Sequence, residues 1–117
     1  MMTTSAHVKD QNALNQRIQK QITDNPVMLY MKGDKTFPQC GFSARVVEIL
    51  NKVAVPYVTH DVLSDPELRF GMKHFSNWPT FPQLFVKGEL VGGCDIVSGM
   101  FDSGELQNLL KGKGLLS

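Results

Sequence analysis

Apolar residues recur at two spacings along this chain, and the spacings predict which segments form helices and which form strands. Leu14, Ile18 and Ile22 lie four residues apart, which marks one face of an amphipathic helix that should end before the Asn-Pro pair at 25–26. Residues 27–31 form an unbroken apolar run that is too short for a helix and is typical of a strand covered on both faces. We therefore expect a helix followed by a central strand.

The next segment has helical spacing followed by a run of strand-forming residues. Ala44, Val47 and Leu50 lie at helical spacing within residues 41–53, and residues 57–62, after Pro56, are rich in β-branched residues. A succession of strand, helix and strand predicts a right-handed parallel unit.

A third helix is predicted to begin at residues 64–67. The sequence Ser-Asp-Pro-Glu there has the form of a capping box with proline at the first helical position. Leu68, Met72 and Phe75 then supply the buried face, and Asn77 begins the next turn.

The last third of the chain predicts a hairpin and two short helices. Residues 84–86 and 90–91 are strand formers joined by Lys-Gly-Glu at 87–89, and two glycines lead into a helix from Cys94. A final helix should begin near residues 102–105, with inward residues Leu106, Leu109 and Leu110. The whole order, α-β-α-β-α-β-β-α-α, predicts an α/β fold with a four-stranded mixed sheet flanked by helices on both faces.

Length and composition limit this fold to one unit. The chain has 117 residues, of which 42% are hydrophobic, enough for one core and too few for two. We expect a single domain over residues 1–117, with residues 1–10 as a loose, flexible polar arm.

Charge and hydropathy narrow the classes of partner. The 12 Lys and Arg residues nearly balance the 11 Asp and Glu residues, and the basic ones are scattered singly, so we expect no nucleic-acid partner. No apolar run is long enough to cross a bilayer, and the polar start lacks the apolar core of a secretory signal. We expect the chain to start near Met1 and to be cytoplasmic, with an organellar form left open.

The candidate chemistry centres on one thiol. The chain has only two cysteines, Cys40 and Cys94, so neither a disulfide scaffold nor a four-thiolate metal site within one chain is available. Cys40 falls at the start of a predicted helix, where unpaired N–H groups and the helix dipole stabilise a thiolate. Its sequence resembles a Cys-x-x-Cys redox motif in which Ser43 occupies the place of the second cysteine. Serine cannot form a disulfide with Cys40. A buried or incidental cysteine is the alternative.

Two further loops carry features that could build a site beside this thiol. The prolines around Thr80 and Phe81 precede the hairpin and suggest a bend with a cis bond between Phe81 and Pro82. Gly93 and the glycine before it precede a helix start whose N–H groups could hold a carboxylate. The alternatives are an ordinary proline at the start of a strand and a simple turn.

These loops coincide with a known pattern, since the chain resembles the monothiol glutaredoxins, whose signature is Cys-Gly-Phe-Ser on a thioredoxin-like fold. The resemblance runs from about Leu14 to Leu110. The motifs that carry it are Met-Lys-Gly at 31–33, Pro-Gln-Cys-Gly-Phe-Ser at 38–43, Asn-Trp-Pro-Thr-Phe-Pro-Gln-Leu at 77–84 and Gly-Glu-Leu-Val-Gly-Gly-Cys-Asp-Ile at 88–96.

The resemblance implies that glutathione lies across the three loops. Its glycyl carboxylate would meet Lys32 and Arg69, whose alternative reading is that of solvated surface cations. Its middle would pair with the backbone at Phe81, and its γ-glutamyl end would bind the N–H groups of Cys94 and Asp95. The implied binding residues are Lys32, Cys40, Phe42, Arg69, Thr80, Phe81, Pro82, Gly93, Cys94 and Asp95.

Cys40 would also be the catalytic thiol and the metal ligand. A two-iron, two-sulfide [2Fe-2S] cluster takes four ligands, usually thiolates. One chain offers one suitably placed cysteine, so two chains and two glutathiones in a symmetric homodimer complete the set. We therefore expect an iron–sulfur cluster assembly and transfer protein acting in iron homeostasis, and the resemblance implies proteins of the BolA type and cluster-accepting apoproteins as partners.

Two other classes of function compete with this one. In the first, the protein is a glutathione-dependent thiol-disulfide oxidoreductase that removes glutathione from mixed disulfides through Cys40. The loop at residues 32–38 is long, and in the family such a loop is linked to weak oxidoreductase activity, which favours the carrier. The second class, a pure interaction module, leaves the glutathione residues unexplained.

Overall fold

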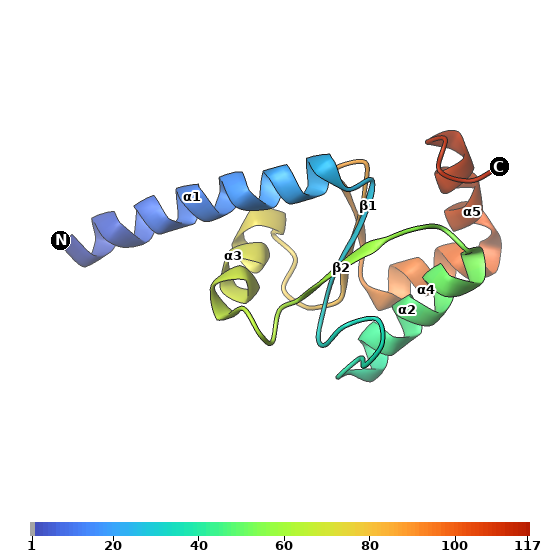
Figure 1. The fold of residues 1–117 in the computed structure, drawn as a ribbon, viewed down its shortest axis with the longest axis horizontal. Helices are drawn as coiled ribbons and strands as arrows, with labels where there is room; N and C mark the ends of the chain where they lie inside the picture. The colour runs from blue at the N-terminus through green and yellow to red at the C-terminus, as the bar shows by residue number, and fades with distance from the viewer. Residues whose placement is uncertain (1) are drawn as a thin grey trace.

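The predicted succession of helices and strands is the one that the structure has. The computed structural model describes the backbone of residues 2–117 and the side chains of residues 11–117, and within them the chain forms five helices and a four-stranded sheet (Figure 1). The elements are α1 (Met2–Asp24), β1 (Val27–Met31), α2 (Gly41–Val53), β2 (Val58–Asp61), α3 (Pro66–Ser76), β3 (Gln83–Val86), β4 (Glu89–Gly92), α4 (Cys94–Ser103) and α5 (Glu105–Gly112).

The sheet is mixed, with strand order β2-β1-β3-β4. Strands β1 and β2 are parallel, whereas β3 is antiparallel to both β1 and β4. All five residues of β1 are buried, as expected for a strand with neighbours on both sides and helices on both faces. The predictions of a central strand, a parallel unit and an antiparallel hairpin are confirmed.

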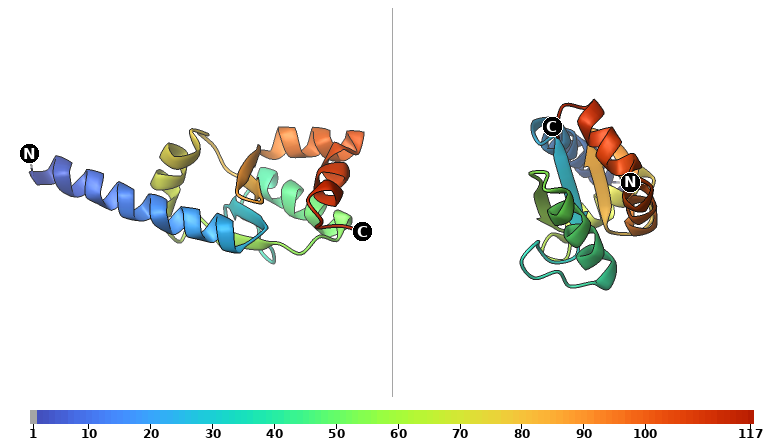
Figure 2. Two further views of the ribbon diagram at one scale, coloured as in Figure 1. Left: turned by 90° about the horizontal axis from the view of Figure 1, so that it is seen from above. Right: turned by 90° about the vertical axis from the view of Figure 1, so that its right-hand side faces the viewer.

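Helices cover both faces of this sheet, so the core has two layers (Figure 2). Alternate residues of β1 supply each layer, because successive side chains of a strand point to opposite faces. Met28 and Tyr30 pack with α1 and α3, whereas Leu29 and Met31 pack with α2, α4 and α5. The expectation of helices on both faces is confirmed.

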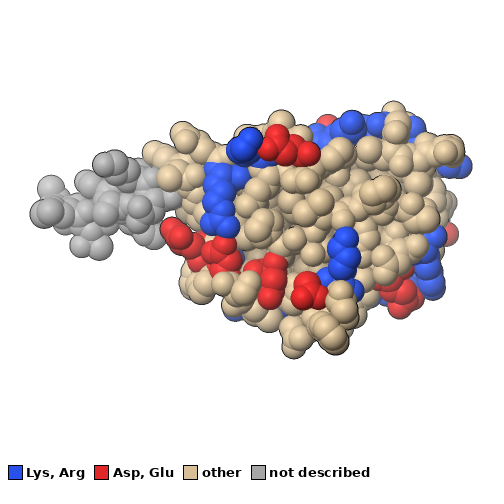
Figure 3. All heavy atoms as spheres, in the orientation of Figure 1, with Lys and Arg blue, Asp and Glu red and all other residues tan. Residues whose placement is uncertain are grey.

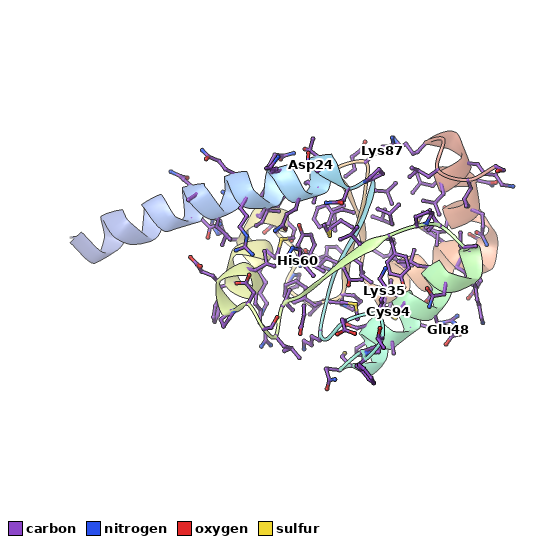
Figure 4. The ribbon with its side chains drawn as sticks, in the orientation of Figure 1. Asp24, Lys35, Glu48, His60, Lys87 and Cys94 are labelled. Carbon is purple, nitrogen blue, oxygen red and sulfur yellow. The ribbon has the colours of Figure 1, made fainter. Side chains whose placement is uncertain are left out.

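Close contacts fix α1 and α3 on their face of the sheet. A Cβ atom at Gly71 of α3 would collide with the side chain of Leu14 in α1, so the absence of a side chain lets the helices approach. The Tyr30 hydroxyl donates to Gln21 Oε1 of α1 at 2.7 Å. The ring of His60, labelled in Figure 4, stacks on Tyr30 with centroids 5.9 Å apart.

Helix α1 begins at Met2, so the backbone of residues 2–10 continues the helix that was predicted around Leu14. The flexibility expected of residues 1–10 stays a prediction. Residues 2–24 contain neither glycine nor proline, so nothing stops the helix from extending outward from the part packed around Leu14. The N-terminal part of α1 extends past α3 in Figures 1 and 2.

None of the helices in the described part of the chain is long and apolar enough to cross a membrane.

Two smaller predictions hold only in part. The cap of α3 is Asp65, whose Oδ1 accepts from the N–H of Leu68 at 3.1 Å. Ser64 is not the cap, because its hydroxyl donates to the carbonyl oxygen of Asp61 at 3.0 Å instead. In α5, Leu106 and Leu110 are fully buried but Leu109 is only partly so, since its position, three residues after Leu106, lies at the edge of the buried stripe.

Charges are locally balanced on the face seen in Figure 3. Basic and acidic side chains lie interspersed there, and no large area of a single sign stands out among the described residues. Several charged side chains pair within helices, such as Lys20 with Asp24 and Arg45 with Glu48, each at 2.9 Å.

Candidate functional site

A cavity of about 440 Å³ opens beside Cys40, where four segments that are distant in sequence meet. Its walls come from the loop after β1, the start of α2, the α3–β3 region and the start of α4. The residues that line it are Lys32, Cys40, Phe42, Arg69, Lys73, Trp78, Pro79, Thr80, Phe81, Pro82, Gly93, Cys94, Asp95 and Ile96. All ten site residues expected from the sequence are therefore brought together around one cavity.

Cys40 is the N-cap of α2 and has an extended backbone, with φ −153° and ψ 138°. This conformation turns the chain into the helix, so Cys40 lies at the helix N-terminus, where the first-turn N–H groups lack intrahelical partners. Hydrogen bonding from the backbone N–H of Ser43 lowers the pKa of the Cys40 thiol; the N–H of Phe42 and the charge of Lys32 act in the same direction, against the effect of burial. The site therefore favours a thiolate.

Ser43 has a structural task that the sequence pattern does not reveal. Its side chain is fully buried, and its Oγ accepts a hydrogen bond from the backbone N–H of Lys32 at 3.2 Å. The hydroxyl also helps to lower the pKa of Cys40. The residue that replaces a resolving cysteine thus ties the start of α2 to the loop that carries Lys32.

The loop after β1 is tightly folded. The N–H of Gln39 donates to the carbonyl oxygen of Lys32 at 2.9 Å, and Gly33 and Pro38 form an antiparallel bridge. Gly33 has a φ of +86°, and a Cβ atom there would collide with the backbone of Phe37 and Gln39. The loop therefore requires glycine at this turn and carries the chain back from Lys32 to Cys40.

The segment before β3 forms another wall of the cavity, and hydrogen bonds from the Gln83 side chain hold it in place. The Nε2 group of Gln83, which is fully buried, donates to the carbonyl oxygens of Trp78 at 3.0 Å and Thr80 at 3.2 Å. The peptide bond between Phe81 and Pro82 is cis, which confirms the bend predicted there.

The fourth wall is the N-terminus of α4, whose N-cap is Gly93. A Cβ atom at Gly93 would lie 3.2 Å from the carbonyl oxygen of Pro82 and 3.3 Å from Trp78 Nε1, so a bare backbone lets the two walls approach each other. The first intrahelical bond here is donated by Val97, at 3.0 Å to Gly93. The N–H groups of Cys94 and Asp95, which precede Val97, need no helical partner and can bind an anion.

Both cysteines contribute to this cavity, and both are free thiols. Cys94 lies at the start of α4 (Figure 4), and its Sγ is 3.9 Å from the hydroxyl oxygen of Ser98. In the described part of the chain, the cavity included, no three His, Cys, Asp or Glu residues gather in a way that could hold a metal ion.

Sequence reasoning missed four lining residues: Lys73, Trp78, Pro79 and Ile96. Trp78 and Pro79 belong to the motif at 77–84 and could have been included on that ground. Lys73 lies four residues after Arg69 in α3, and side chains at this spacing share one helix face, so the position of Arg69 was a usable signal for it.

Comparisons with known proteins agree with this site and fold. A family model described as Glutaredoxin matches residues 27–91. Glutaredoxin 4 of Haemophilus ducreyi is 55% identical over 95 residues, which are 81% of this chain and 89% of that protein. Monothiol glutaredoxin-S11 of Oryza sativa subsp. japonica is 50% identical over 107 residues, which are 92% of this chain but only 22% of that longer protein.

A solved structure extends the agreement to three dimensions. The solution structure of a monomeric truncated mutant of Trypanosoma brucei 1-C-Grx1 is 40% identical and aligns with a TM-score of 0.80, covering 86% of this chain and 92% of that one. The mixed sheet with helices on both faces is thus the thioredoxin-like fold that the resemblance implied. With Cys-Gly-Phe-Ser at residues 40–43 in the cavity wall, the chain belongs to the glutaredoxin family and, within it, to the monothiol glutaredoxins.

Proposed function

We propose that this protein binds glutathione in the cavity beside Cys40 and, with it, holds a [2Fe-2S] cluster that it passes to acceptor proteins. The observation that carries the proposal is the composition of that cavity. It combines a partly exposed thiol with a lowered pKa, cationic side chains and the N-terminus of α4.

The cavity suits each part of glutathione. Lys32 and Arg69 offer positive charge to the glycyl carboxylate. The N–H groups at the start of α4 suit the γ-glutamyl carboxylate, and the carboxylate of Asp95 suits the neighbouring amino group. The backbone at Phe81 would pair with the middle of the peptide, which places the glutathione sulfur beside Cys40. A volume of about 440 Å³ is in the ordinary range for a small-ligand site.

The number of thiolates available indicates how bound glutathione could help to hold an iron–sulfur cluster, which is the cargo of the protein in this proposal. A cluster of this type takes four ligands, and the chain has two cysteines, of which Cys40 has the lowered pKa that suits a metal-binding thiolate. Two copies of Cys40 and two glutathione thiolates make the full set in a symmetric dimer. Because half of the ligands exchange with free glutathione, the cluster can be released to an acceptor.

The surface around Cys40 supports such a pairing of two chains. The side chains of Phe42 and Ile96 line the cavity yet are 62% and 40% exposed, and Phe37 on the neighbouring loop is 69% exposed. Apolar side chains around a metal cluster limit the access of water to it. A second copy docked on this rim would bury them.

The loop at residues 32–38 favours the carrier over the enzyme. Asp34 Oδ1 accepts from the N–H groups of Thr36 and Phe37 at 2.8 Å each. Lys35, labelled in Figure 4, donates to the carbonyl oxygen of Tyr57 at 2.8 Å. This ordered loop borders the thiol and matches the loop that the family resemblance links to weak oxidoreductase activity.

The acidity of Cys40 nevertheless supports a second candidate, glutathione-dependent deglutathionylation. The Cys40 thiolate would attack the glutathione sulfur of a protein–glutathione mixed disulfide, releasing the protein thiolate and forming a Cys40–glutathione disulfide. The thiolate of a second glutathione would then attack this disulfide, so that oxidised glutathione leaves and the Cys40 thiolate is restored. Both candidates use the same bound glutathione.

Partners and location belong to the same proposal. We propose cluster-accepting apoproteins and proteins of the BolA type as partners and the cytoplasm as the compartment. These extensions rest on the family resemblance.

Anaerobic reconstitution with iron, sulfide and glutathione tests the proposal. The visible absorption bands of a [2Fe-2S] cluster should appear in the parent protein and be lost in Cys40→Ser, with unchanged far-ultraviolet circular dichroism. The matched control is Cys94→Ala, which should keep the cluster and bind glutathione within a few-fold of the parent, because the proposal uses its backbone N–H. A Cys40→Ser protein with a stoichiometric cluster would refute the assignment, and a quantitative Cys40–Cys94 disulfide governing activity would favour a dithiol redox protein instead.

A further inference from the structure

Asp61 lies outside the cavity, yet it connects the loop after β1, which is a wall of the cavity, to the loop that leads into α3. It is the last residue of β2, and because β1 and β2 are parallel, it lies opposite Met31, the last residue of β1. Its Oδ1 atom accepts two hydrogen bonds at 2.9 Å each, one from the N–H of Gly33 and one from the N–H of Leu63. One carboxylate oxygen thus joins the loop after β1 to the loop after β2.

The first of these bonds completes the anchoring of Lys32. The backbone N–H of Lys32 donates to Ser43, and its carbonyl oxygen accepts from Gln39. These two contacts tie Lys32 to α2 and to its own loop. The bond from Gly33 to Asp61 is the contact that ties this turn to β2.

The second bond fixes the connection that leads into α3, the helix that carries Arg69. Leu63 follows β2 by two residues, and its N–H donates to Asp61. The hydroxyl of Ser64 donates to the backbone carbonyl oxygen of the same aspartate at 3.0 Å. The next residue, Asp65, caps α3. The start of α3 is therefore held against the residue that holds the Lys32 turn.

We propose that Asp61 is a positioning residue that sets the relative placement of Lys32 and Arg69, the two cations assigned to the glycyl carboxylate of glutathione. The inference rests on the proposed glutathione site. Two cations bind one carboxylate well only when both reach it together, since charge-assisted bonds depend on short distances. Because Asp61 Oδ1 accepts from both Gly33 and Leu63, it fixes the loop after β1 relative to the loop after β2.

Substitutions at Asp61 separate this role from a purely structural one. Asp61→Asn keeps an oxygen acceptor and loses the charge, whereas Asp61→Ala loses both. Calorimetric titration with glutathione should give an affinity within about two-fold of the parent for Asp61→Asn and about five- to tenfold weaker for Asp61→Ala. Thermal unfolding and circular dichroism of both variants check that the fold is intact.

A double-mutant cycle shows whether the effect passes through Lys32. In a Lys32→Ala background the cation to be positioned is gone, so the further Asp61→Ala change should weaken binding by less than about two-fold. An equal loss in both backgrounds, or parent-like binding by Asp61→Ala, would overturn the positioning role. A general loss of stability would not produce this dependence on Lys32.

The pH dependence of Cys40 alkylation gives a second reading that needs no glutathione. Lys32 contributes to the lowered pKa of Cys40, so a displaced Lys32 should raise the alkylation midpoint in Asp61→Ala relative to Asp61→Asn, but not in the Lys32→Ala background. If the parent binds no glutathione while this shift is present, the proposed function fails and the positioning role stands. If the parent binds glutathione and neither effect occurs, the positioning role fails.

Discussion

Hydrogen bonds from the backbone account for more of the acidity of Cys40 than charge does. The N–H of Ser43 is the largest influence on the pKa of the thiol, ahead of the charge of Lys32. This order agrees with the position of Cys40 at the N-cap of α2, where the first-turn N–H groups lack intrahelical partners. Removing a neighbouring charge should therefore leave most of the acidity in place, whereas disturbing the helix start should not.

We predict that Ser43→Ala raises the pH midpoint of Cys40 alkylation, because it removes the hydroxyl that helps to lower the pKa of the thiol and releases the backbone of Lys32. The measurement is the rate of iodoacetamide reaction against pH, in a Cys94→Ala background so that one thiol reacts. Ser103→Ala, at an exposed serine at the end of α4 whose hydroxyl bonds to Met100 and Glu105, is the control and should leave the midpoint unchanged. A midpoint that Ser43→Ala leaves unchanged or lowers would contradict the role given to the hydroxyl.

The two cations of the cavity allow a direct test of its electrostatics. A well-formed charge-assisted pair contributes about 1.5–3 kcal/mol, and a factor of ten corresponds to about 1.4 kcal/mol. We predict that Lys32→Ala and Arg69→Ala each raise the glutathione concentration needed for cluster reconstitution about tenfold or more. Lys111→Ala, at an exposed residue of α5, should have no effect. Identical titrations for all three variants would show that Lys32 and Arg69 are solvated surface charges.

Among the elements, α3 depends most visibly on its first residues. Asp65 caps the helix through Leu68 and also pairs with Arg17 of α1, whose Nη2 lies 2.6 Å from Asp65 Oδ2. The hydrogen bond from Arg17 lowers the pKa of Asp65, and the N–H of Leu68 acts in the same direction. One carboxylate therefore fixes the start of α3 and its attachment to α1.

We predict that Asp65→Ala lowers the free energy of unfolding by about 1–2 kcal/mol at pH 7, the usual loss on removal of an N-cap. Because the pKa of Asp65 is lower in the folded chain than in the unfolded chain, its stabilisation is present above the unfolded value. That stabilisation is lost as the pH falls through the folded value, so the difference between variant and parent should shrink from about pH 5 towards pH 2.

Urea denaturation at several pH values measures this dependence. The matched control is Asp24→Ala, which removes an exposed pairing with Lys20 and should cost less than about 0.5 kcal/mol. A loss at Asp65 that equals the control, or that stays constant down to pH 2, would contradict the roles of cap and ion pair.

The elements could be predicted because their signals are local. The unbroken apolar run at residues 27–31 predicts a strand buried on both faces, and the Asn-Pro pair at 25–26 predicts the end of α1. The capping box at residues 64–67 does not by itself distinguish Ser64 from Asp65 as the cap of α3. Both are good capping residues, and the choice depends on the partner that Ser64 finds at Asp61. Such competition is decided by tertiary contacts that a local pattern does not contain.

The candidate site was predictable for a different reason. The motifs around Cys40, Phe81 and Gly93 are specific enough to group loops that are far apart in sequence, and the structure lines one cavity with them. Asp61 and the role of Ser43 were not predictable, because their importance lies in hydrogen bonds to backbone N–H groups. Any residue type donates such a bond, so the partners leave no signature in the sequence.

At the scale of the whole molecule, the proposed function makes the cavity and the apolar side chains beside it one half of a larger site. Cys40, Phe42 and Ile96 all line the cavity, and the two phenylalanines nearest Cys40 in sequence, Phe37 and Phe42, are among the most exposed apolar residues of the described part of the chain. In the proposed dimer, the cluster would receive one protein thiolate from each chain. Cluster binding and association of two chains should therefore be a single equilibrium.

We predict that the protein without cluster sediments mainly as a monomer, and that the cluster-loaded protein sediments as a dimer only while glutathione is present. Removing glutathione takes away two of the four ligands, so cluster and dimer should be lost together, as should both in Cys40→Ser. Sedimentation velocity, followed at a cluster absorption wavelength and at 280 nm, measures both at once. A cluster-loaded monomer that persists after exhaustive removal of glutathione would mean that other groups supply the missing ligands, and it would remove the basis for a glutathione-ligated carrier.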